Sequence, residues 1–327
     1  MSNSESQIPQ RTVSNVLDRC LGVARDEDVV LLTDDETDSA VVDSLRRGVE
    51  ERGARCVIAV LERFIRPGSE PPRSIAGLLL SCDAAIELTS TFIGSSLARQ
   101  AATAHGVRYI AMPGVETDTF RKGGPLDVDF DELRSVTESL AAAWESATTF
   151  RVTTRGGTDL RGSVKGRKGR ALHGIAREWG AYMAPPDIEA GTAPVEGSTS
   201  GVAVIDADFL FMGKGPLKEP VALHFLDGLL VRIEGQEGSR LSDMIELCSD
   251  LRMANLAEVS VGLNPNGRVC GVAMETESTL GSAHIALGNS IAYGGTVAAV
   301  AHLDCVMRDA TLELDGSPVL VEGRQVS

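Results

Sequence analysis

Four short apolar runs recur at regular intervals in the first half of the chain. They begin at Val29, Cys56, Ala84 and Tyr109, so their starts lie 25 to 28 residues apart. That interval holds one strand and one crossover helix, the unit from which parallel sheets are built. Because the runs are almost continuously apolar, the strands should be covered on both faces. The spacing therefore predicts an α/β domain with a parallel sheet, and helices over residues 13–21, 38–52, 74–82, 94–105 and 131–146.

The turn after the first run is strongly acidic. It reads Thr-Asp-Asp-Glu-Thr-Asp over residues 33–38, and acids at the carboxyl end of a strand would repel a pyrophosphate. The pattern Gly-x-Gly-x-x-Gly, which lets a backbone approach a dinucleotide, follows none of the four runs. We therefore expect no nucleotide cofactor, and we interpret this sheet as a scaffold or as one wall of a cleft.

The composition and the hydrophobic pattern of the sequence change from about Thr149. Glycines become more frequent, strands shorten, and turn signals such as Asp315-Gly316 recur. Asp227-Gly228 lies between apolar runs at 221–225 and 229–233, which is a strong signal for a β-hairpin. One helix is expected over residues 240–251. We predict an α/β domain over residues 1–148 and a mainly antiparallel α+β domain over residues 149–327.

The charge balance narrows the choice of partners. The 327 residues include 31 Lys and Arg against 46 Asp and Glu, for a formal net charge of −15, whereas a nucleic-acid-binding face is usually basic. The longest basic run, residues 165–170, we interpret as a solvated turn rather than a phosphate-binding loop. Aromatic residues make up only 4% of the chain, which disfavours stacking platforms for bases. We expect no nucleic-acid partner.

The chain shows no targeting or membrane signal. No apolar run approaches the roughly 18 residues that a membrane span needs, and residues 1–11 are polar, unlike a signal peptide. The six cysteines are scattered without a Cys-x-x-Cys pair, which is typical of reduced, mostly buried thiols. We expect a cytoplasmic protein that does not associate with membranes.

Histidines are scarce, and two of the five lie near carboxylates close to the C-terminus. His302 and Asp304 are two residues apart in an apolar run, so in a strand both project from the same face. A buried His–Asp hydrogen bond and a shared divalent metal both explain this pair. Glu258 and His284, in two further apolar segments, favour the metal. Nitrogen and oxygen donors of this kind suit Zn, Mn, Co or Fe(II).

An ordered series of motifs extends over residues 185–323. It comprises Ile188-Glu189, Thr192-Ala193-Pro194, Gly215-Pro216-Leu217-Lys218-Glu219, Asp227-Gly228, Ala257-Glu258-Val259, His284-Ile285-Ala286-Leu287-Gly288, His302-Leu303-Asp304 and Asp315-Gly316. In these motifs the chain resembles the aminopeptidase T family of metallopeptidases, which are leucyl aminopeptidase-like, and the related 2,5-dihydroxypyridine 5,6-dioxygenases. The resemblance implies a homodimer or a larger homo-oligomer.

The resemblance also implies a set of metal ligands. In the aminopeptidases, positions that resemble Glu219, Glu258, His284, His302 and Asp304 surround a two-metal site. The dioxygenases resemble this chain at Glu219, His302 and Asp304, but have a histidine at the Glu258 position and an apolar residue at the His284 position. At Glu258, His284 and Glu189 this chain therefore resembles the peptidases.

Two positions depart from the peptidase pattern. Thr279 stands where that family has a glutamate, and Ile291 stands where it has a tyrosine that is expected to stabilise an oxyanion. Glu277 and Tyr293 each lie two residues away, out of register. The sequence alone does not decide whether they replace the missing groups.

These residues predict that the domain over residues 149–327 is a metal-binding catalytic domain. As a hydrolase, it would use a metal to lower the pKa of a bound water from ~16 towards ~7, with Glu189 as the general base. The substrate would be a specialised small molecule or a short peptide-like molecule with an amide-type bond. One alternative is an Fe(II) ring-cleaving dioxygenase whose iron is held by His284, His302 and Asp304. A second alternative is an inactive binding protein of the same fold. The residues that bind substrate are not identifiable from the sequence.

Overall fold

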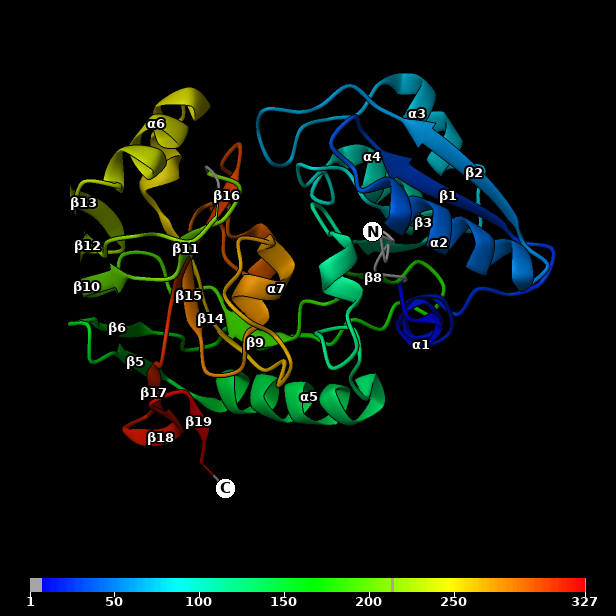
Figure 1. The fold of residues 1–327 in the computed structure, drawn as a ribbon. Coiled ribbons are helices and arrows are strands. Elements are labelled where there is room, and N and C mark those ends of the chain that lie inside the picture. Colours follow the sequence, from blue (N-terminus) through cyan, green and yellow to red (C-terminus); the bar gives the residue numbers. More distant parts are fainter. Residues whose placement is uncertain (1–7, 213–214, 327) are drawn as a thin grey trace, which may run out of the picture. The chain divides into compact units, whose positions relative to one another are not determined.

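The structure, a computed structural model, describes residues 8–212 and 215–326 and consists of two units (Figure 1). The first comprises Met1–Asp131 and His173–Asp187, and the second comprises Glu132–Leu172 and Ile188–Ser327. This division differs from the expected boundary at residues 148 and 149 in two segments. Most of helix α5 (Phe130–Ser146) belongs to the second unit, where the Trp144 indole N–H donates to the Ala190 carbonyl. Residues 173–187 return to the first unit because β8 (Tyr182–Met183) pairs with its sheet.

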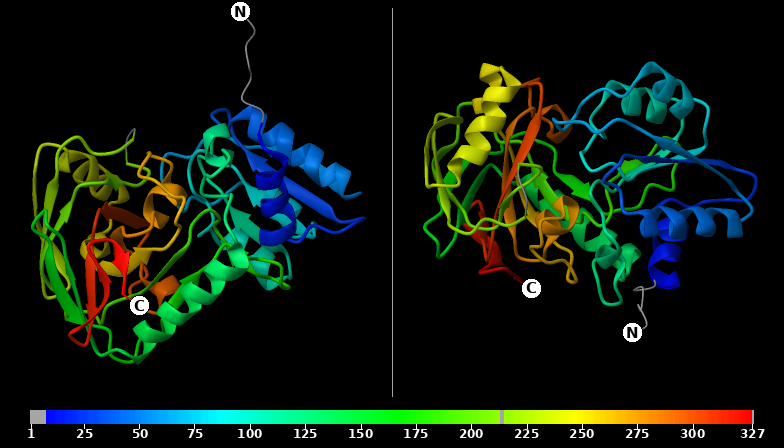
Figure 2. Two further views of the ribbon diagram at one scale, coloured as in Figure 1. Left: turned by 60° about the horizontal axis from the view of Figure 1, so that its bottom comes forward. Right: turned by 45° about the horizontal axis from the view of Figure 1, so that its top comes forward.

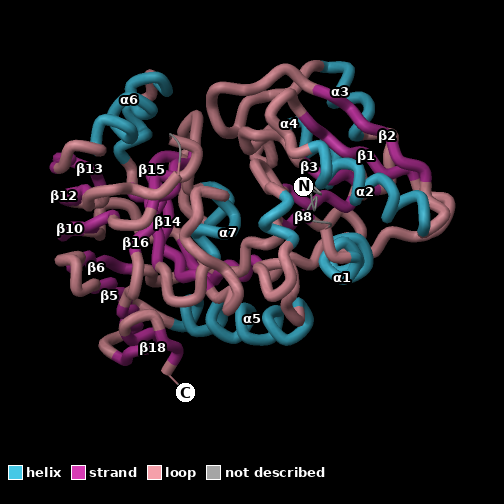
Figure 3. Tube along the Cα trace, in the orientation of Figure 1, coloured by secondary structure: helices cyan, strands magenta, loops and turns pink. Residues whose placement is uncertain are grey.

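A five-stranded parallel sheet organises the first unit (Figure 3). Its order is β2-β1-β3-β4-β8, and all its pairs are parallel, as the spacing of the apolar runs predicts. β1 and β3 are almost completely buried, but the edge strand β2 is exposed on both faces, so the expectation of complete cover is wrong there. Besides β8, the strands of this sheet are β1 (Asp28–Thr33), β2 (Arg55–Val60), β3 (Ala84–Glu87) and β4 (Arg108–Ala111). The helices of the unit are α1 (Gln10–Ser14), η1 (Asn15–Cys20), α2 (Ser39–Glu51), α3 (Arg73–Leu79), α4 (Leu97–Ala104) and η2 (Thr117–Phe120).

The acidic turn after β1 holds two loops of this sheet together. Asp34 is buried, and its carboxylate accepts hydrogen bonds from the Thr37 hydroxyl and, at 2.7 Å each, from the backbone N–H and hydroxyl of Ser90. Ser90 lies just beyond β3, so Asp34 links the loops at the carboxyl ends of two central strands. This carboxylate therefore has a structural role.

Two antiparallel sheets build the second unit (Figures 2 and 3). One has the order β13-β12-β10-β6-β5-β17-β18-β19, and the other has the order β11-β16-β15-β14-β9-β7. The predicted fold class, a parallel α/β part followed by a mainly antiparallel α+β part, is thereby confirmed. The first sheet contains β5 (Thr149–Thr153), β6 (Asp159–Ser163), β10 (Ser200–Ile205), β12 (Val221–Leu226), β13 (Leu229–Glu234), β17 (Thr311–Leu314), β18 (Ser317–Val321) and β19 (Arg324–Gln325). The second contains β7 (Arg170–Leu172), β9 (Glu189–Thr192), β11 (Asp208–Phe209), β14 (Leu256–Gly262), β15 (Ala283–Gly288) and β16 (His302–Met307).

The turns and helices of this unit follow local sequence signals. The predicted hairpin joins β12 to β13, and its Asp227 and Gly228 both have positive φ, 50° and 75°, as a tight two-residue turn between antiparallel strands requires. The helix expected over residues 240–251 is α6 (Gly238–Cys248), and the shorter helices are η3 (Leu251–Ala254), α7 (Ala273–Ser278) and η4 (Ile291–Tyr293). Among the described residues, no helix combines the length and the apolar character needed to cross a membrane.

Candidate metal centre

One face of the six-stranded sheet gathers most of the candidate site residues. Its register pairs Glu189 with Gly262, Ser260 with His284, and Ala286 with Asp304. Paired residues on adjacent strands share a face, and every second residue along a strand returns to that face. One face therefore carries Glu189 of β9, Glu258 of β14, His284 of β15, and His302 and Asp304 of β16.

Gly191 allows two strands that carry cluster residues, β9 and β14, to approach each other closely. Gly191 pairs with Ser260, and a Cβ at position 191 would lie 1.7 Å from the Ser260 hydroxyl oxygen and 2.5 Å from the Val259 carbonyl oxygen. The Ser260 hydroxyl in turn donates a short hydrogen bond to Glu258. Only glycine at position 191 allows β9 to approach the strand that carries Glu258 so closely.

The side chains form a continuous series of short contacts. Glu258 lies 2.9 Å from His302 Nε2 through one oxygen and 3.4 Å from His284 Nε2 through the other. His284 Nε2 is also 2.9 Å from Glu189, and His302 Nε2 is 3.2 Å from Asp304. The exposed fractions of the Glu258, Glu189 and His284 side chains are at most 1%, against 21% for His302 and 15% for Asp304. Solvent therefore reaches the cluster at its His302–Asp304 end.

Burial and neighbouring charges shift the pKa values of these groups in opposite directions. Burial opposes ionisation of Glu258, but hydrogen bonds from His284 and His302 bring the pKa of its carboxyl down to about 2. Burial raises the pKa of Glu189, and the charge of His284 only partly offsets this. Despite burial, the neighbouring carboxylates raise the pKa of both imidazoles well above the usual value. In the metal-free cluster the carboxylates therefore favour the protonated form of both imidazoles, and burial favours the protonated form of Glu189.

The donor set fits a divalent metal. In the described part of the chain, three groups of side chains bring ligand atoms within 4.8 Å of one another: Glu189–Glu258–His284, Glu258–His302–Asp304 and Glu277–His284–Asp304. Ligands about 2.1 Å from one ion, at roughly right or tetrahedral angles, lie about 3 Å apart, which is the spacing of the contacts above. Together the groups hold four carboxylates and two imidazoles, an excess of buried negative charge that a divalent cation would offset.

Two residues that lie out of register in the sequence reach the cluster. The Tyr293 hydroxyl donates to Glu189 at 3.2 Å, and its ring stacks on that of His302 with centroids 5.2 Å apart. Glu277 of α7 belongs to the third ligand group. In contrast, Ile291 is 53% exposed, and the Thr279 hydroxyl turns back to the Glu275 carbonyl. Glu277 and Tyr293 thus reach the cluster, while Thr279 and Ile291 do not.

The structure does not bring Glu219 to the cluster. This residue is exposed, and its backbone N–H donates to the Glu237 carboxylate at 3.0 Å. It follows a loop whose residues 213 and 214 lie outside the described part of the chain. The metal-ligand role of Glu219 therefore stays a prediction of the resemblance, because its backbone is held at the start of α6.

The fold and the cluster define an α/β protein with a candidate metal centre on the antiparallel sheet of its second unit. The chain belongs to the 2,5-dihydroxypyridine 5,6-dioxygenase family (NicX), whose sequence profile matches residues 10–327. No curated protein matches the sequence.

Two solved structures share the fold over nearly the whole chain. A 2,5-dihydroxypyridine dioxygenase from Pseudomonas putida is 18% identical with a TM-score of 0.80, and the match covers 97% of this chain and 96% of that one. Wild-type AmpT from Thermus thermophilus is 14% identical with a TM-score of 0.71, and the match covers 97% and 98%. The resemblance to both families is therefore confirmed. At these identities the similarity concerns the fold and not the reaction.

Proposed function

We propose that this chain is a metal-dependent hydrolase that cleaves an amide-type bond in a small or short peptide-like substrate. The observation that carries the proposal is the make-up of the cluster: each ligand group has one imidazole and two carboxylates, and Glu258 and Asp304 each belong to two groups. A carboxylate that faces two ion positions can bridge a metal pair of the kind used in hydrolysis. Fe(II) oxygenases, in contrast, typically use two histidines and one carboxylate.

The environment of each carboxylate supports a different role for it. Glu258, His302 and Asp304 would hold one ion, and Glu277 and His284 would join Asp304 around a second. A divalent ion held there would lower the pKa of a bound water and polarise the substrate carbonyl. In the metal-free cluster, hydrogen bonds from His284 and His302 lower the pKa of Glu258 despite its burial, so this carboxylate ionises readily, as a ligand must. Glu189, whose pKa is raised by burial, is the general base. The Tyr293 hydroxyl donates to one oxygen of Glu189, and the other oxygen lies 2.9 Å from His284 Nε2.

An Fe(II) ring-cleaving dioxygenase is the second candidate, and the family membership favours it. His302, Asp304 and His284 would supply the two imidazoles and one carboxylate of such a site. The obstacle is Glu258, which is completely buried and lies 2.9 Å from His302. A fourth protein ligand at this point would fill a position that oxygen or substrate needs.

Metal analysis followed by turnover under controlled oxygen tests the proposal. Protein purified without added metal, and then reloaded with Zn²⁺, Mn²⁺, Co²⁺ or Fe²⁺, would be assayed on amino-acid p-nitroanilides, dipeptides and 2,5-dihydroxypyridine, with and without air. We expect oxygen-independent amide cleavage that Glu189→Gln abolishes while bound metal is retained. The exposed carboxylate of Glu246 on α6 provides the matched control, Glu246→Gln.

Two results would refute the hydrolase. If turnover requires oxygen and consumes one oxygen molecule per substrate, the chain is a dioxygenase. If the wild-type protein binds no divalent metal, the inactive binding protein is the better description.

A further inference from the structure

Tyr293 reaches the cluster from an exposed turn. It ends the short helix η4, whose Ile291 is 53% exposed, and Gly294 follows it with a φ of 84°. Yet its hydroxyl binds Glu189, and its ring lies within 7° of parallel to that of His302. Segments with few buried neighbours are ordinarily the mobile ones. The position of this ring therefore depends on contacts from outside the turn.

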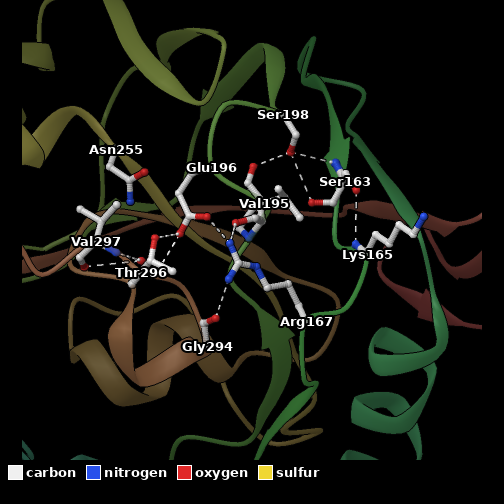
Figure 4. Close-up of polar contacts among 12 residues, drawn as sticks. Ser163, Lys165, Arg167, Val195, Glu196, Ser198, Asn255, Gly294, Thr296 and Val297 are labelled. Carbon is white, nitrogen blue, oxygen red and sulfur yellow. Dashed lines mark hydrogen bonds and ion pairs between the residues drawn. The ribbon is translucent and has the colours of Figure 1, made fainter.

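The basic turn at residues 165–170 supplies one set of these contacts. Arg167 donates to the carbonyl of Gly294 at 2.7 Å (Figure 4) and to that of Pro194 at 3.3 Å. It also pairs with Glu196, whose other oxygen accepts hydrogen bonds from the Thr296 N–H at 2.7 Å and hydroxyl at 2.9 Å. The side chain of Arg167 is only 12% exposed, so the interpretation of this run as a solvated turn is wrong for Arg167. One guanidinium and one carboxylate fasten the chain just after Tyr293.

Arg170 acts on the ring itself. Its guanidinium carbon lies 4.6 Å from the centroid of the Tyr293 ring, and the same guanidinium donates to the carbonyl of Ala292. A cation over an aromatic face is attracted to it, most strongly where water is excluded. Tyr293 thus contacts Arg170 and His302 through its ring and Glu189 through its hydroxyl.

We propose that Arg170 is a positioning residue of the candidate metal centre and that Arg167 fixes the turn on which it acts. Apart from the carboxylates that face its Nε2 atom, two contacts orient the ring of His302: the hydrogen bond from Nδ1 to the Asn289 carbonyl at 2.7 Å and the stack with Tyr293. When Arg170 is removed, the second contact loosens, and the donor atom of His302 is less well aimed. Contacts behind a metal ligand typically contribute about 10- to 100-fold to metal affinity. The inference rests on the proposed function in taking His302 as a metal ligand.

Co²⁺ titration tests this inference, because its visible absorption reports ligand geometry as well as affinity. The metal-free wild type would be compared with Arg170→Ala, Arg170→Lys and the control Arg151→Ala, which removes an exposed arginine paired with Asp159. We expect Arg170→Ala to weaken Co²⁺ binding about tenfold or more and to alter the spectrum. Arg170→Lys should restore much of both, since an ammonium can also lie over the ring. Arg151→Ala should match the wild type.

Hydrogen exchange and thermal unfolding separate positioning from general stability. We expect backbone exchange at residues 291–298 to accelerate in Arg170→Ala and in Arg167→Ala, while β14 to β16 exchange as in the wild type. A wild-type Co²⁺ affinity and spectrum in Arg170→Ala would overturn the inference, whether or not its Tm falls. Failure of the wild type itself to bind Co²⁺ would instead refute the metal centre, before any variant is compared.

Discussion

Gly191→Ala is the perturbation that most directly tests the face on which the cluster is built. The added Cβ would lie 1.7 Å from the Ser260 hydroxyl oxygen and 2.5 Å from the Val259 carbonyl oxygen, so β9 and β14 must move apart. Overpacking typically costs about 1–3 kcal/mol, and a clash with backbone belongs at the upper end. At about 2–4 °C per kcal/mol for a unit of this size, the Tm should fall by roughly 6–12 °C. Co²⁺ binding should weaken as well, because β14 carries Glu258.

Thermal unfolding followed by circular dichroism, together with Co²⁺ titration, measures both effects. Gly77→Ala is the matched control: this glycine lies in α3 with no atom within 4 Å of a new Cβ, so stability should rise by about 0.5–1 kcal/mol. Adding Ser260→Ala to Gly191→Ala should not restore stability, since the Val259 carbonyl still obstructs the Cβ. If Gly191→Ala melts and binds Co²⁺ like the wild type, the register that places Glu189 beside Glu258 is wrong.

Three further predictions concern the ligands, the pH dependence and the first unit. Glu258→Gln should lower Zn²⁺ affinity by at least about 100-fold in isothermal titration calorimetry, more than the loss of an outer contact costs; an unchanged affinity would exclude Glu258 as a ligand. Because the carboxylates raise the pKa of His284 and His302, their stabilisation of the metal-free protein is complete below about pH 6.5 and is lost as the pH rises. The Tm in EDTA should therefore fall from pH 6 to 9, and less steeply in His302→Gln than in the wild type; equal slopes in the two proteins would refute this reasoning. Asp34→Ala should cost about 1–3 kcal/mol in urea unfolding, since it leaves the partly buried donors of Ser90 without their carboxylate acceptor; calorimetry of the wild type with NAD, FAD or ATP should show no binding.

Elements whose signals are local were predictable. The apolar runs that begin at Val29, Cys56, Ala84 and Tyr109 became strands β1 to β4, and Asp227-Gly228 closed the expected hairpin, because periodicity and turn chemistry act over a few residues. The two-residue strand β8 was not predictable. It joins the parallel sheet only by pairing with β4, more than 70 positions earlier in the chain, and pairing at that distance leaves no local pattern.

The candidate site, too, was only partly predictable from the sequence. His302 and Asp304 share a face by simple alternation along a strand, so their proximity could be predicted. Bringing Glu189, Glu258 and His284 to that face depends on the register of three strands, which alternation alone does not specify. The resemblance to known families supplied that grouping. It also suggested Glu219, which the structure places on the surface. Arg170 lay in a basic run with no sign of the aromatic ring that it contacts.

The two departures from the peptidase pattern show why position in a sequence is a poor guide at helix ends. In a strand, a shift of two residues returns a side chain to the same face. In a short helical turn the same shift swings it to another side, so Tyr293 at the end of η4 faces Glu189 while Ile291 faces solvent. Similarly, α7 ends at Ser278, which leaves Glu277 within the helix and turns Thr279 back to the Glu275 carbonyl. A carboxylate and a phenol therefore reach the cluster although the expected positions hold neither. The difference from a two-histidine iron site then lies at Glu258. Because Glu258 is on a strand, its carboxylate projects from the face that carries the cluster, and the conformation of the neighbouring turns does not change this.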